Sequence, residues 1–304
     1  MKAVQITGFG GPDVLKVQDA PAPAAAPGMV VVRVAAAGVN PVDWKIREGY
    51  MKDLMPWTFP ATLGNEIAGT VEAVGSGVTG FSPGDEVHGS TGPTGAFAEL
   101  VVVDAKSLAH KPAGLSMVEA AALPVAVATS TPVLEAGAIG KGTRVLVHAA
   151  AGGVGHVFVQ LARAKGAEVT ALGSPGNLDF LRGLGADHVI DRTTDYAEKI
   201  GKFDVVLDAF GPSAQEKSWG LLKPGGILVS LTAPPSQDVA AAHGVRATMV
   251  FGRPDGAALA EADRLVEAGA LKVTIQRTYP VDDAADALAE VQRGQARGKI
   301  VLTF

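Results

Sequence analysis

The sequence of 304 residues contains no cysteine, which excludes disulfide bonds, thiolate-bound zinc, iron–sulfur clusters and a cysteine nucleophile. Any redox chemistry must therefore be carried by a bound cofactor. Charged residues are few, at 19%, and the net charge of −5 comes with no run of like charge that could follow a phosphate backbone. The composition argues against nucleic acid as the main partner, and its 47% of hydrophobic residues predicts a globular fold.

Long apolar runs are also absent. The N-terminal segment MKAVQITGFG alternates apolar and polar residues, whereas a signal peptide has an uninterrupted apolar stretch before its cleavage site. The most apolar later segment, 120–128, includes Pro124 and is shorter than the roughly 20 residues that cross a bilayer. We therefore expect a cytoplasmic protein with no membrane partner.

Turn residues divide the chain into two kinds of structure. The first third has short β-type runs between glycine and proline residues, such as AVQIT, VLKVQ and IAGTVEAVG, which predicts a compact β-domain. From about residue 140, strands alternate with helical stretches, as in βαβ units around a parallel sheet. A doubly wound dinucleotide-binding sheet requires six strands, and we expect them at 143–149, 168–172, 188–191, 203–208, 226–232 and 245–251.

The end of the chain returns to the first kind of structure. A strand at 272–279, a helix at 282–292 and the final strand KIVLTF have no position left in the parallel sheet, so we assign them to the β-domain. The sequence thus predicts an α/β protein with two domains. The β-domain comprises residues 1–116 and 270–304, and the Rossmann domain comprises residues 117–269.

A glycine-rich turn connects the first strand and the first helix of the parallel domain. The strand TRVLVH leads into AAGGVG, residues 150–155, and an amphipathic helix follows. Pyrophosphate must approach backbone N–H groups at a helix N-terminus, which side chains at Gly152 or Gly155 would obstruct. Ala150 replaces the first glycine of the G-x-G-x-x-G fingerprint, and a turn that binds nothing is the alternative. The strand–turn–helix order favours a cofactor bound at Gly152, Gly153, Val154 and Gly155.

The residues after the second strand predict which cofactor is bound. NAD-binding folds place an acid about 20 residues past the first glycine, on the ribose 2′-OH, but residues 172–177 read LGSPGN. A small hydroxyl residue tolerates a 2′-phosphate and a nearby cation favours it. Arg192 is a candidate cation, although a solvated surface arginine is an equally good interpretation. We therefore predict NADPH, with Ser174, Asn177 and Arg192 near its phosphate, and the missing acid argues against a methyltransferase.

Seven motifs occur together along the chain: GVNPVDWKIREG (38–49), LGNEIAGTVEAVG (63–75), FSPGDEVHG (81–89), LPVAVATST (123–131), HAAAGGVG (148–155), LGADHVID (184–191) and RGKIVL (297–302). In this combination the sequence resembles the medium-chain dehydrogenase/reductase superfamily, within it the zinc-free quinone oxidoreductase branch that includes zeta-crystallin-like proteins. The resemblance covers essentially the whole chain. It implies a GroES-like β-domain joined to a Rossmann doubly wound parallel sheet, with the nicotinamide in the cleft between them.

The resemblance also implies which positions bind zinc in the zinc-dependent relatives. Those proteins use two cysteines and a histidine, and the matching positions here are Asn40, Asn65 and Val125, a set that does not bind zinc. The structural zinc lobe is missing too, because the loop after Gly89 is short and lacks cysteine. Zinc alcohol dehydrogenase chemistry is therefore excluded. Hydride transfer from NADPH to a quinone or an α,β-unsaturated carbonyl remains, because such acceptors delocalise the incoming charge.

Asn40 has two interpretations that are compatible. As local structure it is the N-cap of a helix, with Pro41 in the first position and Asp43 in the first turn. The resemblance places its side chain over the nicotinamide cleft. We predict Asn40 and Tyr50 as catalytic residues. Tyr50, with Trp57 and Phe59, lies in a stretch that the family uses near the acceptor, although at least one of the three is expected to pack in the core.

The ends of later strands supply further candidate cofactor contacts. Leu231 and Thr232 follow the fifth strand and Phe251 ends the sixth, at the sheet edge where such ligands lie. The resemblance places Thr129 on the nicotinamide side.

Four further polar residues have no assigned role. Glu66 resembles the acid of the zinc enzymes, and without a metal it is expected to bind nearby backbone. Lys299 reaches either the cofactor or the solvent. His148 and His156 flank the glycine turn, but neither has a second ligand at metal spacing, so we expect both to be structural.

These observations predict an NADPH-dependent, zinc-independent reductase of a small quinone or enone. The family suggests a homodimer formed by edge pairing of the strand at 245–251. One alternative is an enoyl reductase that acts on an acyl thioester or a natural-product intermediate. The other is a protein that binds NADPH without catalysing a reaction.

Overall fold

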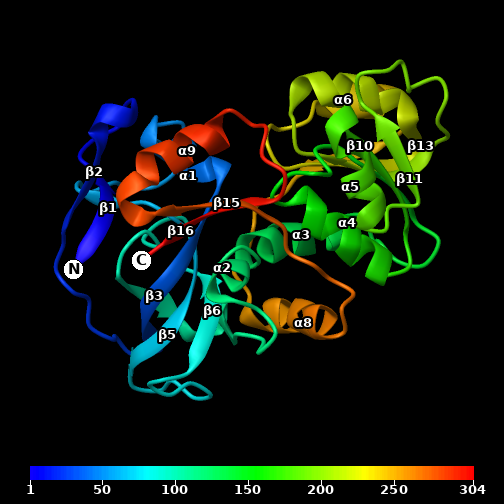
Figure 1. The fold of residues 1–304 in the computed structure, drawn as a ribbon. Coiled ribbons are helices and arrows are strands. Elements are labelled where there is room, and N and C mark those ends of the chain that lie inside the picture. The colour runs from blue at the N-terminus through cyan, green and yellow to red at the C-terminus, as the bar shows by residue number, and fades with distance from the viewer. The chain divides into compact units, whose positions relative to one another are not determined.

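Valine-rich segments of the first third of the chain form a β-domain in the computed structural model, which describes residues 1–304. This first unit comprises Met1–Val125, Pro254–Ala268 and Val273–Phe304, so it holds both ends of the chain (Figure 1). Its smaller sheet has the order β2-β1-β4, and its larger sheet has the order β15-β16-β3-β5-β6-β8, with β7 also paired to β3. The strands are β1 (Lys2–Ile6), β2 (Leu15–Asp19), β3 (Met29–Val39), β4 (Ala61–Thr62), β5 (Glu66–Val74), β6 (Glu86–Ser90), β7 (Leu100–Asp104), β8 (Leu108–His110), β15 (Ile275–Pro280) and β16 (Lys299–Thr303).

The long strand β3 organises the larger sheet. Its sequence MVVVRVAAAGV buries side chains on both faces, and it pairs antiparallel with β5, β7 and β16. Leu288 of the C-terminal helix α9 (Ala284–Gln292) belongs to the same hydrophobic cluster as Val30, Val32 and Val34 of β3. The C-terminal segments therefore complete the core of the β-domain, as predicted.

Three other helices belong to this unit: α1 (Pro41–Arg47), α2 (Met117–Ala120) and α8 (Gly256–Glu267). The expected domain limits, 1–116 with 270–304 and 117–269, differ from the compact units at 117–125, 254–268 and 270–272. The first two segments lie in the first unit, because α2 contacts β3 and β5 and α8 contacts β8, and residues 270–272 lie in the second.

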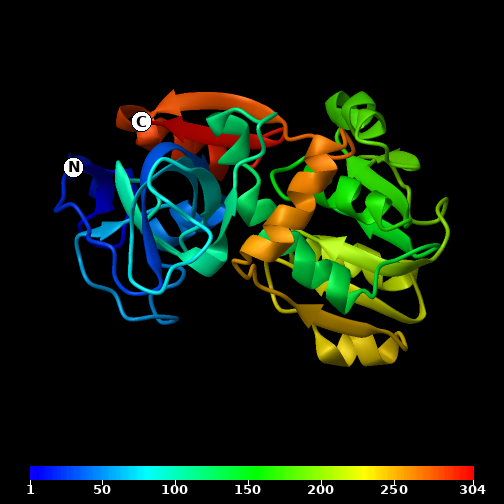
Figure 2. The same cartoon turned by 90° about the horizontal axis from the view of Figure 1, so that it is seen from below.

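The second unit, Ala126–Arg253 with Gly269–Lys272, contains a six-stranded parallel sheet. Its order, β11-β10-β9-β12-β13-β14, is that of a Rossmann fold, in which the first strand lies at the centre of the sheet. All six predicted strands are present, and β14 forms one edge with α7 beside it (Figure 2). The elements are β9 (Arg144–Val147), α4 (Gly155–Ala164), β10 (Glu168–Gly173), α5 (Leu178–Gly183), β11 (His188–Asp191), β12 (Phe203–Asp208), α6 (Pro212–Ser218), β13 (Leu222–Ser230), α7 (Gln237–Ala242) and β14 (Arg246–Met249).

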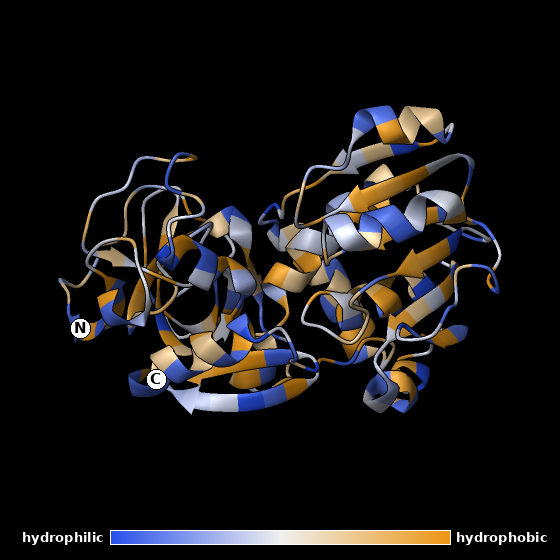
Figure 3. Cartoon of the chain, turned by 90° about the horizontal axis from the view of Figure 1, so that it is seen from above, coloured by the Kyte–Doolittle hydropathy of each residue, from blue (hydrophilic) through white to orange (hydrophobic).

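The central strands of this sheet are apolar along most of their length, as expected where helices cover both faces. The strands accordingly show mostly hydrophobic residues in Figure 3. Leu146 of β9, Val206 of β12 and Leu228 of β13 are fully buried and belong to one cluster. The interior of the sheet is therefore fixed by packing, and polar side chains concentrate at its two ends.

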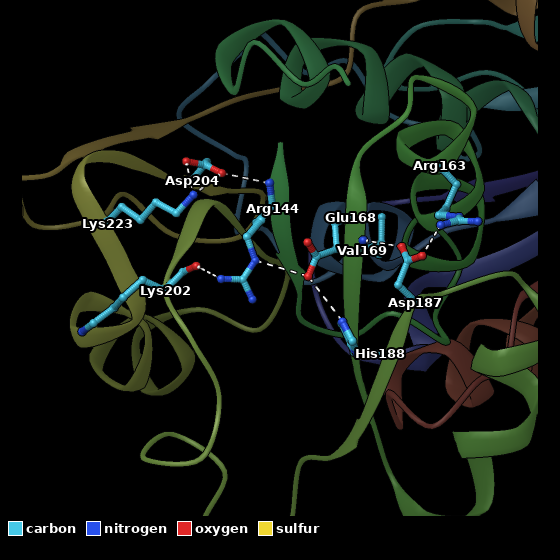
Figure 4. Close-up of polar contacts among 9 residues, drawn as sticks. All are labelled: Arg144, Arg163, Glu168, Val169, Asp187, His188, Lys202, Asp204 and Lys223. Carbon is cyan, nitrogen blue, oxygen red and sulfur yellow. Dashed lines mark hydrogen bonds and ion pairs between the residues drawn. The ribbon is translucent and has the colours of Figure 1, made fainter. Parts of the chain in front are cut away.

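Ion pairs join the amino ends of the strands (Figure 4). Glu168 lies 3.3 Å from both Arg144 and His188, and Asp204 binds Lys223 at 2.8 Å. Exposed pairs of this kind contribute little to the free energy of unfolding. The charged side chains at the amino end of the sheet are thus paired with one another.

The helical stretch Met117–Ala136 includes α2 and the longer α3 (Pro124–Ala136). With 20 residues, it is longer than the apolar segment expected from the sequence, and its length and composition would suffice to cross a membrane. However, 67% of it is buried inside the protein, as in the core helix of a soluble domain.

Candidate functional site

The predicted cofactor residues gather at the carboxyl end of the six-stranded sheet. All six strands run parallel, so the segments that follow them meet at one edge. This edge receives the glycine turn after β9, Ser174 after β10, Arg192 after β11, Leu231 and Thr232 after β13, and Phe251 after β14.

The glycine turn leads into α4, which begins at Gly155, and residues 152–154 of the turn are half-buried. A Cβ added to Gly155 would lie 2.2 Å from the carbonyl oxygen of Ala149, so no side chain fits there. A Cβ at Gly152 would lie 3.2 Å from the same oxygen. The first N–H groups of a helix have no intrahelical partner and favour an anion. This arrangement fits the predicted binding of a dinucleotide diphosphate at residues 152–155, although the N–H of Gly152 itself donates to the carbonyl oxygen of Ala149 at 2.9 Å.

The two histidines beside the turn are engaged within the protein. His156 is fully buried, with its Nδ1 atom 2.9 Å from the carbonyl oxygen of Gly152. The Nε2 atom of His148 lies 2.9 Å from the hydroxyl of Ser218, and burial lowers the pKa of His148 to about 4. Both residues therefore help to shape the turn, in agreement with the structural role expected for them.

Ser174, Asn177 and Arg192 lie together where β10 and β11 end. The Asn177 amide donates to the Ser174 hydroxyl at 3.1 Å, and the Arg192 N–H donates to the carbonyl of Gly173 at 2.9 Å. The Arg192 side chain is exposed, with its guanidinium 5.5 Å from the centre of the Phe210 ring. The backbone of Arg192 is thus joined to the end of β10, next to a hydroxyl and an amide, and its guanidinium is the cation available to a phosphate bound there.

The neighbouring carboxylate of Asp191 is directed elsewhere. It accepts hydrogen bonds from the N–H and the hydroxyl of Thr193 at 2.9 and 2.7 Å. These bonds lower the pKa of Asp191, so it is ionised at neutral pH. The acid closest in sequence to Arg192 is therefore Asp191, and its carboxylate is already hydrogen-bonded to Thr193.

Two further hydroxyl groups lie near the carboxyl edge of the same unit, that of Thr232 after β13 and that of Thr129 on α3. Thr232 Oγ1 is buried without a hydrogen-bond partner. Thr129 on α3 lies against the backbone that follows Phe251, because a Cβ added to Gly252 would be 3.0 Å from the Thr129 hydroxyl. The Phe251 side chain is 64% exposed. The Phe251 ring is therefore accessible at this edge, whereas the Thr232 hydroxyl is shielded from solvent.

Asp208, which the sequence did not single out, holds the loops of this edge in place. It is fully buried at the end of β12 and accepts hydrogen bonds from the N–H groups of Phe210 and Gly211, both at 2.8 Å. Its other oxygen accepts from Gln215 and from Ser230, at 3.0 and 2.8 Å. Asp208 therefore fixes the turns after β12 and β13.

The second candidate region, in the first unit, centres on Asn40. Asn40 is the N-cap residue of α1, and its N–H donates to Asp43 Oδ2 at 2.7 Å, as the capping interpretation predicts. The side chain of Asn40 is turned into the protein and is 5% exposed. Its amide donates to Asn65 Oδ1 at 2.9 Å and to Glu66 Oε1 at 2.8 Å, and its oxygen accepts from Lys299.

Glu66 and Lys299 form an ion pair beside Asn40, with exposed side-chain fractions of 0% and 3%. From the sequence we expected Lys299 to reach either the cofactor or the solvent. Its side chain is buried, so the solvent alternative was wrong. The other oxygen of Glu66 accepts from the N–H of Val125 at 2.7 Å, so the expected backbone contact is confirmed and is only part of its role. Gly38 makes room for this carboxylate, since an added Cβ would lie 2.2 Å from Glu66 Oε1.

Asp43 adds a second buried carboxyl group to this cluster. Burial raises its pKa to about 7, while the hydrogen bond from Asn40 and the charge of Lys299 act in the opposite direction. Glu66 raises the pKa further by charge repulsion. At neutral pH the Asp43 carboxyl group of this cluster is therefore close to its midpoint.

The predicted aromatic residues of the first unit are not gathered at Asn40. Tyr50 is 70% exposed, and its ring meets the edge of Trp44 at 5.8 Å. Trp57 and Phe59 pack around Phe9, with ring centres 5.5 and 5.1 Å apart. Packing thus accounts for Trp57 and Phe59, whereas a catalytic role for Tyr50 stays a prediction.

The donor groups at the positions equivalent to the zinc ligands of relatives are amides and backbone. Asn40 and Asn65 are hydrogen-bonded to each other, and Val125 contributes its N–H to Glu66. No group of three or more histidine, cysteine, aspartate or glutamate side chains that could hold a metal ion occurs in residues 1–304. The residue types here therefore do not fit zinc.

Residues 26–113 match the family "Alcohol dehydrogenase GroES-like domain", and residues 184–302 match the family "Zinc-binding dehydrogenase". The chain is similar to the 2-methylene-furan-3-one reductase of Solanum lycopersicum, with 37% identity over 319 aligned positions that cover 99% of this chain and 79% of the relative. It is also 38% identical to a segment of the pikromycin polyketide synthase component PikAII of Streptomyces venezuelae, a match over 91% of this chain and 8% of that component.

Among solved structures, the quinone oxidoreductase from Coxiella burnetii has the same fold, with a TM-score of 0.90 and 32% identity. The match covers 100% of this chain and 99% of the other. The matched domains, the strand order and the glycine turn agree with the family suggested by the sequence motifs. The chain therefore belongs to the medium-chain dehydrogenase/reductase superfamily, in its zinc-free quinone oxidoreductase branch.

Proposed function

We propose that this protein is a zinc-independent oxidoreductase that transfers hydride from NADPH to a quinone or an α,β-unsaturated carbonyl compound. The observation that carries the proposal is the side-chain-free backbone at Gly152 and Gly155, at the carboxyl end of a Rossmann sheet. The names of the tomato reductase and the Coxiella oxidoreductase support this class of acceptor. A bound reduced nicotinamide would supply the hydride.

The protein's own contribution is binding and orientation. The glycine turn and the start of α4 hold the diphosphate, and Ser174, Asn177 and Arg192 hold the 2′-phosphate. Thr129, Leu231, Thr232 and Phe251 line the same edge of the sheet, where they orient the rest of the cofactor. A quinone or enone stabilises the added charge by delocalisation, so positioning and exclusion of water suffice without a metal.

A direct assay tests this function. Purified protein is mixed with NADPH and a panel of quinones and simple enones, and the loss of NADPH absorbance in the near ultraviolet is followed. We expect turnover with at least one class and little with saturated ketones. Tight binding of NADPH with no acceptor reduced would instead support the non-catalytic alternative.

An enoyl reductase is the second candidate function, and the similarity to part of a polyketide synthase component favours it. An enoyl thioester also accepts hydride at its β-carbon and delocalises the charge onto the carbonyl oxygen. Including a short enoyl thioester in the panel distinguishes the two. A much higher kcat/KM for the thioester than for any quinone or enone would assign this function instead.

The Arg192→Ala variant tests the preference for NADPH. Loss of the guanidinium removes a charge-assisted contact to the 2′-phosphate, so we expect the Kd for NADPH to rise about tenfold and the Kd for NADH to stay the same. Fluorescence titration with both cofactors measures this. Arg163→Ala, at the amino end of the sheet, is the matched control and is expected to change neither value. Equal weakening of both cofactors by Arg192→Ala would contradict the assignment.

The expected homodimer would use β14, because this strand has an unpaired edge in the six-stranded sheet. A second copy can add its own β14 to that edge. Analytical ultracentrifugation of the wild type and of a Thr248→Pro variant tests the arrangement, and a monomeric wild type would rule it out. The cytoplasmic location and a small molecule as the only partner class complete the proposal.

A further inference from the structure

Three strand ends of the first unit bring Asn40, Glu66 and Lys299 together. In the antiparallel pairing of β16 with β3, Ile300 lies opposite Val39, which puts Lys299 at the level of Asn40. In the pairing of β3 with β5, Ala37 lies opposite Ile67, so Glu66 is at the level of Gly38. The register of the sheet therefore creates this cluster, and Lys299 and Asn40 are 259 residues apart in sequence.

The two charges determine which way the Asn40 amide points. An ammonium can only donate hydrogen bonds and an ionised carboxylate can only accept them. Lys299 therefore requires the oxygen of Asn40 on its side, and Glu66 requires the nitrogen on its side, which is the arrangement observed. Turning the amide over would set its NH2 group against the ammonium and its oxygen against the carboxylate.

Burial makes this preference strong. Glu66 and Lys299 are almost fully shielded from solvent, so their interactions are weakly screened. Asn65 adds a third fixed contact, because its oxygen accepts from the Asn40 amide at 2.9 Å. The side chain of Asn40 is therefore held in one rotamer and one orientation by an ion pair that uses no metal.

We propose that Lys299, with Glu66 as its counter-charge, is a positioning residue that fixes the Asn40 amide for the reaction. This inference rests on the proposed function and adds a defined role for an ion pair that the sequence did not assign. Lys299 acts through Asn40, so its removal should affect turnover only where Asn40 is present.

The first test compares Lys299→Met with the wild type. We expect kcat to fall about tenfold to a hundredfold, since small misplacements of an active-site group have effects of this size. The Kd for NADPH should stay within about twofold. Lys299→Arg, which keeps the charge and the donors, should restore most of kcat. If Lys299→Met does not fold, Lys299→Gln takes its place.

A matched control separates positioning from stability. Lys111 is also buried in the first unit, with 6% of its side chain exposed, and pairs with Glu86 at 3.1 Å. Lys111→Met should lower the melting temperature but leave kcat unchanged. Equal kcat values for Lys299→Met and Lys111→Met would overturn the proposal, as would a loss of NADPH affinity in Lys299→Met that Lys299→Arg fully restores.

A double-mutant cycle and an activity-independent measurement complete the test. In an Asn40→Ala background, Lys299→Met should lower kcat no further, whereas multiplying effects would contradict the inference. Hydrogen exchange of the Asn40 side-chain amide, assigned by its loss in Asn40→Ala, should be slow in the wild type and fast in Lys299→Met. If no acceptor is reduced by the wild type, the proposed function fails, and the exchange rates still decide whether Lys299 orients Asn40.

Discussion

Gly155→Val is expected to weaken NADPH binding by about a thousandfold, which corresponds to about 4 kcal/mol. A Cβ at this position would lie 2.2 Å from the carbonyl oxygen of Ala149, a distance at which the backbone must move. Such a shift displaces the N–H groups at the start of α4 from the diphosphate. Calorimetric titration with NADPH measures the effect, and far-ultraviolet circular dichroism reports whether the variant folds.

Two further variants make this result interpretable. Gly152→Ala places its Cβ 3.2 Å from the same oxygen, so we expect a folded protein with a smaller loss of affinity. Gly183→Ala, at the end of α5, has no atom within 4 Å of the added Cβ and is expected to bind NADPH like the wild type. A folded Gly155→Val variant with unchanged affinity would show that the cofactor does not use this turn.

The free energy of unfolding is expected to fall by about 4 kcal/mol between about pH 4 and pH 8 because of Asp43. Burial raises the pKa of Asp43 from 3.8 to about 7 in the folded protein. Between these values the folded protein keeps a proton that the unfolded chain has released. The stabilisation is therefore complete below the unfolded-state pKa and is lost as the pH rises through the folded-state value.

Asp43→Asn isolates this contribution, because asparagine has the shape of the protonated acid and can still accept from the Asn40 N–H. Urea denaturation measures the free energy of unfolding at about pH 4 and pH 8. The slope of this free energy against pH should be steeper in the wild type than in the variant. Asp286→Asn, an exposed aspartate in the first turn of α9, is the control and should leave the slope unchanged. Equal slopes for the wild type and Asp43→Asn would contradict this assignment.

Much of the fold was predictable because its signals are local. The strand at 188–191 and the strand at 203–208 agree with the structure to the residue, since each is a short apolar run between turn residues. The domain limits were harder to predict. The helix α8 has the same amphipathic pattern whichever unit it packs on, and its contacts with β8 and the turn before it show that it belongs to the first.

The candidate site was predictable to different degrees in its two parts. The predicted cofactor residues follow strand ends, so a correct list of strands places Ser174, Arg192 and Thr232 at one edge. The ion pair of Glu66 and Lys299 depends on the register of two antiparallel pairings, which no local pattern encodes. Asn40 was singled out as a cap and as an active-site residue, but the sequence did not show that its side chain is hydrogen-bonded to Glu66 and Lys299.

The insertion of the second unit into the first has a consequence for biosynthesis. Residues 126–253 make up almost the whole Rossmann unit, and they are synthesised before β15 and β16. Until β16 has been synthesised, part of β3 in the larger sheet lacks its antiparallel partner. An unpaired strand edge of this kind promotes aggregation or chaperone binding. In nascent chains halted before β16, we therefore expect the Rossmann unit to resist proteolysis, although Lys299, the ion-pair partner of Glu66, has not yet been synthesised.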